Sequence, residues 1–340
     1  MKIAVDAMGG DHGPAVVVEG AIVARQEFGV SVVLVGDQAT IERELDRLGG
    51  RQPGVEIRHA SQVVGMAESP SQALRRKRDS SLRVAAELVR DGHASAFVSA
   101  GNTGAAMAVS MFVIGVLRGV DRPAIAAVLP NLRGYTVLLD VGANVTPRSW
   151  HLFQFAVMGH VYARDILGIP RPRVGLLSVG EEEGKGNELT RDAYDTLRES
   201  SLNFAGNVEG RDIYNGACDV VVTDGFTGNV ALKISESLAD MLGAMIKEEL
   251  TRDIRSRLGA VLAVPAFQRF RRRVDYTEMG GAPLLGIDGA AVISHGSSPP
   301  KAIKNAVRVA AEWAKAGLNE HIKAALDLEL TRSQREGGRE

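Results

Sequence analysis

The 340-residue chain has a single cysteine, few aromatic residues and no excess of either charge. One cysteine excludes an intramolecular disulfide framework and any cysteine-rich zinc or iron–sulfur site. The 40 Lys and Arg nearly cancel the 41 Asp and Glu, giving a formal net charge of −1. A general nucleic-acid binder is usually more basic, so nucleic acid is not expected as a partner, although local basic patches survive this average. An aromatic content of 5% beside 38 glycines favours tight turns over a β-sandwich.

Long hydrophobic runs are also missing. The most hydrophobic helical stretch, residues 104–117, is shorter than the roughly 20 residues of a membrane-spanning helix. The apolar run at the start of the chain ends at Asp6, whereas a secretory signal needs a longer one and a cleavage site. We therefore expect a soluble, cytoplasmic protein. Its length favours one large domain over residues 1–330, with room for two intimate lobes, and a flexible tail at 331–340.

Short runs rich in Val, Ile and Leu alternate with longer amphipathic segments along almost the whole chain. Strands are predicted at 3–7, 31–35, 55–59, 94–99, 125–129, 136–139, 174–178, 219–223 and 291–294. Helical patterns between them include 40–48, 80–89, 150–167 and 188–199. This alternation predicts an α/β fold with a doubly wound, mostly parallel sheet. The continuous apolar runs are typical of strands that helices cover on both faces.

The loops that follow these strands combine glycine with Asn, Asp or Ser. They lie at 8–11, 100–104, 141–144, 180–187, 206–210, 224–229 and 295–298. In open α/β sheets ligands bind beyond the carboxyl ends of the strands, where glycine lets backbone N–H groups approach and helix N-termini favour anions. We therefore expect a phosphate- or carboxylate-bearing substrate at one edge of the sheet. Any single loop of this kind is equally well explained as an ordinary turn.

Familiar catalytic motifs are not present. Residues 180–186 lack the four-residue gap and the Ser or Thr of a P-loop, and 184–189 are one glycine short of the dinucleotide fingerprint. There is no Gly-x-Ser-x-Gly elbow, and the seven histidines lack the spacing of a zinc hydrolase. Cys218 is better explained as a small buried hydrophobe than as a nucleophile. What remains suits a reaction in which an oxyanion such as orthophosphate is itself the attacking group.

Seven motifs, in order, resemble those of the phosphate acyltransferases of bacterial phospholipid synthesis. They are DAMGGD (6–11), VSAGNTG (98–104), DVGAN (140–144), KGNEL (185–189), GNVEGRD (206–212), DGFTGNV (224–230) and GGAPLLG (280–286). The chain is identified as a member of that family from Met1 to about Trp313. It departs from the family pattern at Ser237, where glycine is usual, and at Pro299-Pro300, where an acidic residue is expected.

The resemblance implies an enzyme that moves a fatty acyl group from acyl-acyl carrier protein to orthophosphate. No cofactor is expected and no metal requirement is indicated, although the carboxylates do not exclude one. The acyl phosphate would then feed a membrane acyltransferase that acylates glycerol 3-phosphate. The implied fold is like that of phosphate acetyltransferases and isocitrate dehydrogenases, in a homodimer that associates peripherally with the membrane. Two alternatives stay open: a phosphate acetyltransferase acting on short acyl-CoA, and a non-enzymatic membrane-docking scaffold.

Four residues within these motifs and loops are candidates for catalysis: Lys185, Asn229, His295 and Asp224. Lys185 would hold phosphate or the thioester oxyanion, unless it is a solvated loop lysine. His295 would give a proton to the departing thiolate, unless it is structural. Candidate substrate-binding residues are Asp6, Gly9, Gly10, Asp11, Gly101, Asn102, Thr103, Asp140, Asn144, Asn187, Asn207, Glu209 and Ser297. Asparagine amides can donate to phosphate or carbonyl oxygens. Asparagine caps helices equally well, and so does aspartate.

Two further segments indicate partners. The cations Arg75, Arg76, Lys77 and Arg78 would grip the pantetheine phosphate or an acidic carrier protein, unless they form a solvated face. Residues 228–275 are expected to form a dimerisation helix, with an apolar stripe over 228–258, followed by an amphipathic hairpin tip. The alternative for the stripe is packing on the chain's own core.

The hairpin tip combines apolar residues with arginine. Its apolar residues are Leu258, Val261, Leu262, Phe267 and Phe270, and residues 252–273 hold seven Arg and one Asp, a local charge of +6. This combination is typical of a segment that lies in the membrane interface and is attracted to anionic lipid. Pro265 is expected to kink the chain at the tip. The alternative is that the arginines pair with Glu248, Glu249 or a partner chain.

Overall fold

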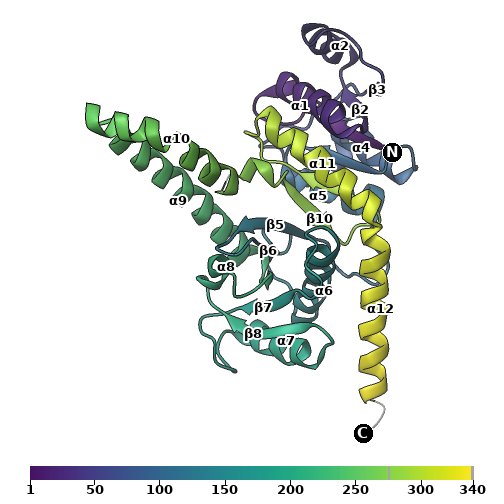
Figure 1. Cartoon of the computed structure of the whole chain (residues 1–340). Helices are drawn as coiled ribbons and strands as arrows, with labels where there is room; N and C mark the ends of the chain where they lie inside the picture. Colours follow the sequence, from purple (N-terminus) through teal and green to yellow (C-terminus); the bar gives the residue numbers. More distant parts are fainter. Residues whose placement is uncertain (275, 338–340) are drawn as a thin grey trace.

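The structure is a computed structural model that describes residues 1–274 and 276–337 (Figure 1). Its strands are β1 (Lys2–Asp6), β2 (Ser31–Gly36), β3 (Val55–His59), β4 (Ala96–Ser99), β5 (Ala124–Pro130), β6 (Tyr135–Leu139), β7 (Arg173–Leu177), β8 (Asn203–Val208), β9 (Val220–Val222), β10 (Ala282–Leu285) and β11 (Ala291–Ile293). In the described residues they form one 11-stranded sheet in the order β3-β2-β1-β4-β11-β10-β5-β6-β9-β7-β8. All nine predicted strands are present, and β8 and β10 were not predicted.

The sheet is mostly parallel, as predicted, but its direction reverses in the middle. Strands β3, β2, β1, β4 and β11 are mutually parallel, and so are β6, β9, β7 and β8. Between these halves, β10 is antiparallel to both β11 and β5, and β5 is antiparallel to β6. Three reversals leave the two halves running in opposite directions. The glycine loops of the two halves therefore follow strands of opposite direction and do not share one edge of the sheet as expected, although loops after β4, β6 and β9 still line one pocket.

Helices cover both faces of the sheet, which confirms the doubly wound architecture. They are α1 (Gly13–Phe28), α2 (Gln38–Arg47), α3 (Pro70–Arg76), α4 (Ser81–Arg90), α5 (Thr103–Val109), α6 (Ser149–Asp165), α7 (Glu188–Glu199), α8 (Asp212–Asn215), α9 (Gly225–Thr251), α10 (Ile254–Val274), α11 (Pro300–Ala316) and α12 (Leu318–Gly337). Alternate side chains of β1 enter different cores. Ile3 and Val5 join residues of α1, α6, α11 and α12, whereas Ala4 joins residues of α4 and α5. The π-helical turn Ser110–Ile114 follows α5 directly.

The termini of two helices bear on the sequence expectations. Helix α11 begins at Pro300 with Pro299 at its N-cap, so the Pro-Pro pair sets a helix start. Helix α12 continues through Gly337, so part of the expected tail at 331–340 is helical. Residues 338–340 lie outside the described part of the chain.

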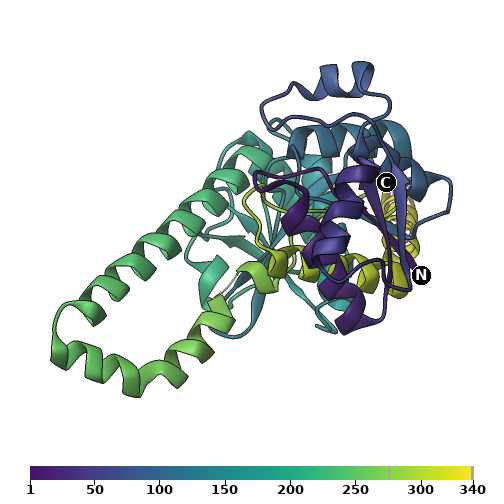
Figure 2. The same ribbon diagram turned by 90° about the horizontal axis from the view of Figure 1, so that it is seen from above.

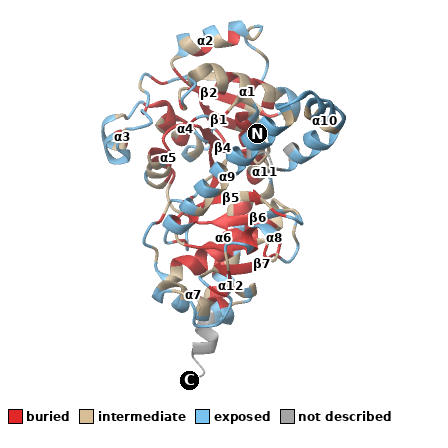
Figure 3. Cartoon of the chain, turned by 90° about the vertical axis from the view of Figure 1, so that its left-hand side faces the viewer, coloured by how far each residue is buried: buried red, intermediate tan, exposed pale blue. Residues whose placement is uncertain are grey.

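Helices α9 and α10 form a hairpin that protrudes from the body of the molecule (Figures 1 and 2). In α9 only Gly225 and Gly228 are buried, and no residue from 254 to 270 is buried. The apolar stripe of α9 is thus not covered by the chain's own core, and Figure 3 shows the hairpin largely exposed. The turn lies at residues 252–253 and Pro265 lies inside α10, so the expectation that Pro265 forms the tip of the hairpin is wrong. No described helix is both long and apolar enough to cross a membrane.

Candidate functional site

In the first half of the sheet, the loops after β1, β4 and β11 converge. The N–H of Asp11 donates to the Gly296 carbonyl at 2.8 Å. Glycine is required at position 9, because a Cβ there would lie 2.8 Å from the Gly101 nitrogen. Gly9 therefore meets Gly101, and Gly10 meets Gly296, as backbone against backbone, a packing that side chains would prevent.

A buried carboxylate organises this loop cluster. Asp6 accepts the Ser99 hydroxyl at 2.7 Å, and Ser99 Oγ in turn accepts the Gly101 N–H at 3.0 Å. Burial raises the pKa of Asp6, although hydrogen bonds from Ser81 and Ser99 oppose that rise. At 2% exposure, Asp6 holds the Gly101 turn in place within the loop cluster.

The second half has a matching carboxylate at the end of β6. Asp140 is fully buried and its oxygens accept five hydrogen bonds. The donors are the N–H groups of Ile125, Gly142, Ala143 and Asn144 and the Asn144 amide, at 2.6–3.2 Å. The Asn144 amide also donates to the Pro123 carbonyl at 2.8 Å. In this arrangement Asp140 and Asn144 use their polar atoms to shape the 141–144 loop.

Helix α9 begins against this loop. Asp224 caps it by accepting the N–H of Thr227 at 2.9 Å and its hydroxyl at 2.7 Å. The helix packs so closely that a Cβ at Gly228 would lie 1.9 Å from the Asp140 carbonyl oxygen. Asn229, one residue further along, is exposed and its side chain lies beside Gly142.

The Lys185 loop lies between β7 and α7 and is tied to β8. Lys185 is exposed, and its N–H donates to the Glu182 carbonyl at 3.2 Å. The Asn207 amide donates to that same carbonyl at 2.9 Å. Asn187 caps α7 by accepting the Thr190 N–H at 3.0 Å. The two candidates Asn207 and Asn187 thus hold the ends of this loop.

The remaining candidates have local partners. Glu209 pairs with Arg211 at 3.4 Å. His295 Nδ1 and the Ser297 hydroxyl are 2.8 Å apart, and both residues are exposed. Asn102 caps α5 by accepting the Ala105 N–H at 2.9 Å, while its amide donates to carbonyls of the 65–68 loop.

One pocket of about 270 Å³ joins the two halves. It is lined by Thr103, Gly104, Met107, Ile125, Val141, Gly142 and Asn229. Thr103 and Gly104 open helix α5, and their backbone N–H groups have no hydrogen-bond partner within residues 1–274 and 276–337. The first turn of a helix carries partial positive charge and favours anions. Met107, Ile125 and Val141 supply an apolar wall to the same pocket.

Of the residues predicted from the sequence, this pocket brings together Thr103 and Asn229. Lys185, His295 and Asp224 are not among its lining residues. Sequence reasoning had not selected Gly104, Met107, Ile125, Val141 and Gly142 as site residues. Gly104, Val141 and Gly142 lie inside motifs already noted. Met107 lies one helical turn after Thr103, and this spacing indicates that both residues are on the same face of the helix.

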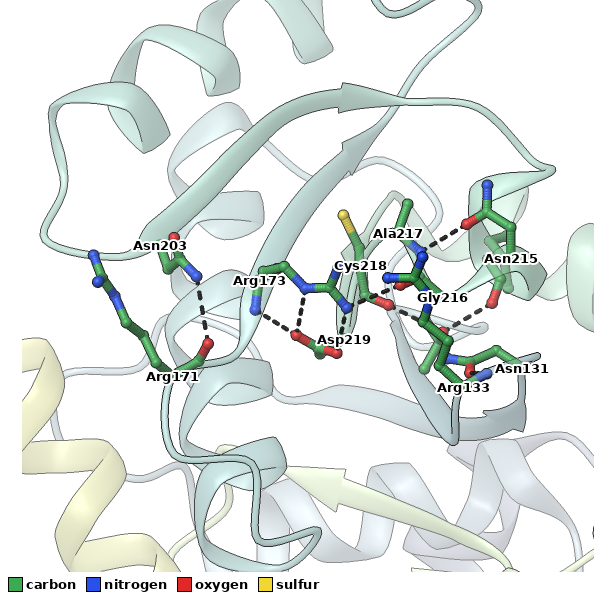
Figure 4. Close-up of polar contacts among 12 residues, drawn as sticks. Asn131, Arg133, Arg171, Arg173, Asn203, Asn215, Gly216, Ala217, Cys218 and Asp219 are labelled. Atoms are coloured by element: carbon green, nitrogen blue, oxygen red, sulfur yellow. Dashed lines mark hydrogen bonds and ion pairs between the residues drawn. The ribbon is translucent and has the colours of Figure 1, made fainter.

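Cys218 lies apart from this pocket, beside an ion pair (Figure 4). Arg173 meets Asp219 at 2.9 Å and also donates to the Gly216 carbonyl at 2.9 Å. The thiol side chain is 1% exposed, and burial raises the pKa of Cys218 to about 11. A protonated, buried thiol is a poor nucleophile, so Cys218 packs as a hydrophobe. Within the described ranges, no cluster of three His, Cys, Asp or Glu residues is arranged to hold a metal.

The fold is that of the phosphotransacetylases. A phosphotransacetylase from Streptococcus pyogenes has a TM-score of 0.65 and 17% sequence identity, covering 93% of this chain and 94% of that one. The EutD phosphotransacetylase from Staphylococcus aureus has a TM-score of 0.61 and 16% identity, covering 92% and 94%. These identities are low, so the likeness establishes the architecture alone. It confirms the predicted fold class.

The sequence places the chain more narrowly. Residues 1–321 match the family described as "Fatty acid synthesis protein". A phosphate acyltransferase from Geobacter sulfurreducens is 53% identical over 331 residues, covering 97% of this chain and 96% of its own. One from Pelobacter propionicus is 56% identical over 322 residues, covering 95% and 93%. The chain belongs to the phosphate acyltransferase family and is an acyltransferase, which confirms the resemblance found in its motifs.

Proposed function

We propose that this enzyme transfers a long-chain fatty acyl group from acyl-acyl carrier protein to orthophosphate, giving acyl phosphate for phospholipid synthesis. The observation that supports this most is the pocket between the two halves. The start of α5 offers partial positive charge and two unpaired N–H groups at Thr103 and Gly104. Asn229 adds an exposed amide, and Met107 adds apolar surface. Such a pocket suits an anion and an acyl group held side by side.

In the proposed reaction a phosphate oxygen attacks the thioester carbonyl carbon. The new C–O bond forms as the C–S bond breaks, the electron pair leaves with sulfur, and the thiolate takes up a proton. Asn229 donates to phosphate or to the carbonyl oxygen, where such a donor is worth about 3–4 kcal/mol of barrier. Lys185 and His295 do not line the pocket, and they remain the candidates for supplying positive charge and the proton from the neighbouring loops. The reaction needs no acyl-enzyme, and Cys218 is not suited to form one because it is buried and its pKa is raised to about 11.

The outer surfaces support the proposed partners. Arg75, Arg76 and Arg78 are exposed and form no ion pair within the part of the chain described here, so they remain open to an acidic carrier protein. Lys77 differs, because it pairs with Glu68 at 2.5 Å. Lys77, the third cation of the run, thus fastens the loop that carries the other three.

The protruding hairpin supports the proposed homodimer and the proposed membrane contact. Apolar side chains of α9 such as Leu238 and Met245 are 49% and 55% exposed, which leaves a stripe for the same helix of a second copy. On α10, Leu262 is 85% and Val261 68% exposed, beside a basic segment suited to anionic lipid. We infer a cytoplasmic enzyme that associates peripherally with the membrane and passes its product to a membrane glycerol-3-phosphate acyltransferase.

The test is acyl phosphate formation from palmitoyl-acyl carrier protein, with and without orthophosphate, beside acetyl-CoA. Phosphate-dependent loss of the palmitoyl thioester with matching acyl phosphate is expected. Turnover of acetyl-CoA alone would assign the short-chain activity instead. Binding of the carrier protein without turnover of either thioester would indicate a scaffold.

A further inference from the structure

Residues 61–80 form an arm that leaves the body after β3 and returns to it before α4. Its neck is closed by hydrogen bonds between its two ends. Ser61 donates its N–H and its hydroxyl to Asp79 at 2.8 and 2.6 Å. Gln62 and Ser80 form a parallel β-bridge beside them. The arm is therefore a loop whose ends are fixed together.

The interior of the arm is also cross-linked. Lys77 donates to the Val63 carbonyl at 2.6 Å and pairs with Glu68, whose carboxylate accepts the Gly65 N–H at 3.1 Å. These bonds join the basic end of helix α3 to the 63–68 turn. A displacement of α3 is consequently passed to that turn. Figure 3 shows α3 on the outside of the molecule, next to α5.

The Asn102 side chain joins the 65–68 turn to helix α5, in addition to the buried side chains of Val64 and Ala73, which pack in the core with α4 and α5. The Asn102 amide nitrogen donates to the carbonyl oxygens of Gly65, Met66 and Glu68 at 3.3, 2.8 and 2.9 Å. The Asn102 side-chain oxygen faces the other way and accepts the Ala105 N–H at 2.9 Å, which caps α5. Only 9% of Asn102 is exposed. The two ends of one amide thus hold the arm and the first turn of α5.

A second contact brings the arm to the same place. Pro70, the first residue of α3, lies so close to α5 that a Cβ at Gly104 would be 2.8 Å from its Cγ. Gly104 and Thr103 are the α5 residues that line the pocket beside Asn229. The arm therefore contacts α5 at the same residues that form the wall of the pocket.

We propose that Asn102 is a positioning residue that couples the arm to the pocket. An acidic partner that docks on Arg75, Arg76 and Arg78 shifts the 65–68 turn, and Asn102 transmits that shift to Thr103 and Gly104. The pocket is then brought to its working geometry by the carrier protein that delivers the acyl group. This inference rests on the carrier-protein surface in the proposed function.

The discriminating variant is Asn102→Asp. Aspartate has the same shape and still caps α5 with a side-chain oxygen, but it cannot donate to the three carbonyls. A matched control is Asp37→Asn, the reverse exchange at the N-cap of α2, where Asp37 accepts the Thr40 N–H at 2.9 Å. The control is expected to behave like the unaltered enzyme in every measurement below.

The first measurement is hydrogen exchange with and without carrier protein that bears no acyl group. In the unaltered enzyme the carrier should slow exchange over both 70–78 and 103–109. In the Asn102→Asp variant it should still slow exchange over 70–78 but no longer over 103–109. If the carrier still protects both 70–78 and 103–109 in this variant, the proposed coupling through Asn102 is wrong, but the proposed carrier-protein surface is supported. If the carrier protects neither segment of the unaltered enzyme, the carrier surface is wrong and the coupling falls with it.

The second measurement is a double-mutant cycle on kcat/KM for palmitoyl-acyl carrier protein. Asn102→Asp and Arg76→Glu should each lower it by about tenfold, an effect the size of one or two net hydrogen bonds. Because both changes break the same connection, the combined variant should lose no more than the larger single loss. Losses that multiply would show two independent effects and overturn the coupling. The KM for phosphate should rise in Asn102→Asp and stay unchanged in Arg76→Glu when carrier is saturating.

Discussion

Replacing Asp140 by Asn tests how much of the second half depends on one buried carboxylate. The two side chains have the same shape, but one carboxylate oxygen becomes an NH₂ group. In the unaltered protein the backbone N–H and the side-chain amide of Asn144 donate to Asp140 Oδ2 at 2.6 and 3.0 Å. If the NH₂ group of the new asparagine takes the place of Oδ2, these two donors face another donor. Each buried donor left without an acceptor costs about 1–3 kcal/mol. Relief from burying a charge offsets part of this cost, so we expect the free energy of unfolding to fall by about 2–4 kcal/mol.

Urea unfolding followed by far-UV circular dichroism measures this loss. The matched control is Asp224→Asn, because Asp224 is a half-buried helix cap and asparagine caps as well as aspartate. The control should change the free energy of unfolding by less than about 0.5 kcal/mol. An Asp140→Asn protein as stable as the control would refute the view that Asp140 organises the 141–144 loop.

Three further predictions concern the thiol, the histidines and the hairpin. Because Cys218 is buried and its pKa is raised to about 11, iodoacetamide at pH 8 should label it only after unfolding. Cys218→Ser should retain full activity. Rapid labelling of the folded enzyme would contradict the burial of this thiol. Burial lowers the pKa of His151 and of His160 below their ordinary value of 6.5, so the unfolded chain binds more protons on acidification and stability should be lost as the pH falls through 6.5. His160→Gln should flatten part of that loss in urea titrations at pH 7 and pH 5, and an unchanged slope would remove His160 as a contributor. If α9 forms the proposed dimer, Leu238→Glu on α9 should give a monomer in light scattering. Leu262→Glu on α10 should leave the proposed dimer intact and reduce flotation with anionic vesicles, and the reverse pattern would exchange the roles of the two helices.

Local pattern was enough to predict most strands and the layering, because both depend on runs of apolar residues. It did not show the reversal of the sheet, since strand direction is set by pairing between distant segments. One signal was available: the short connection between β5 and β6, residues 131–134, is the length of a hairpin loop and indicates an antiparallel pair. The missed strand β10 contains Pro283 and is only four residues long, and β8 is an edge strand with few buried residues.

In the candidate site, too, local sequence pattern predicted some features and not others. The glycine motifs located the loops correctly, but residue type alone does not reveal what an amide bonds to. Asn102, Asn187 and Asp224 turn out to cap helices, whereas Asn229 remains exposed at the pocket. The Asp140 carboxylate accepts hydrogen bonds from five donors within the chain, and no sequence pattern indicates this. Whether each of these residues also touches substrate stays a prediction.

In the proposed reaction, phosphate attacks the thioester in the pocket where α5 meets Gly142 and Asn229. The most direct measurement is the rate of acyl phosphate formation from palmitoyl-acyl carrier protein at saturating phosphate in Asn229→Ala. Asn229 is exposed, so the variant should fold normally. The control is Asn215→Ala, another exposed asparagine, which removes only local bonds to Asp212 and to the Ala217 N–H. A fall in kcat of about 10²–10³ is predicted for Asn229→Ala, with no change in the control. Turnover that is the same in both variants would contradict this site and place the reaction elsewhere.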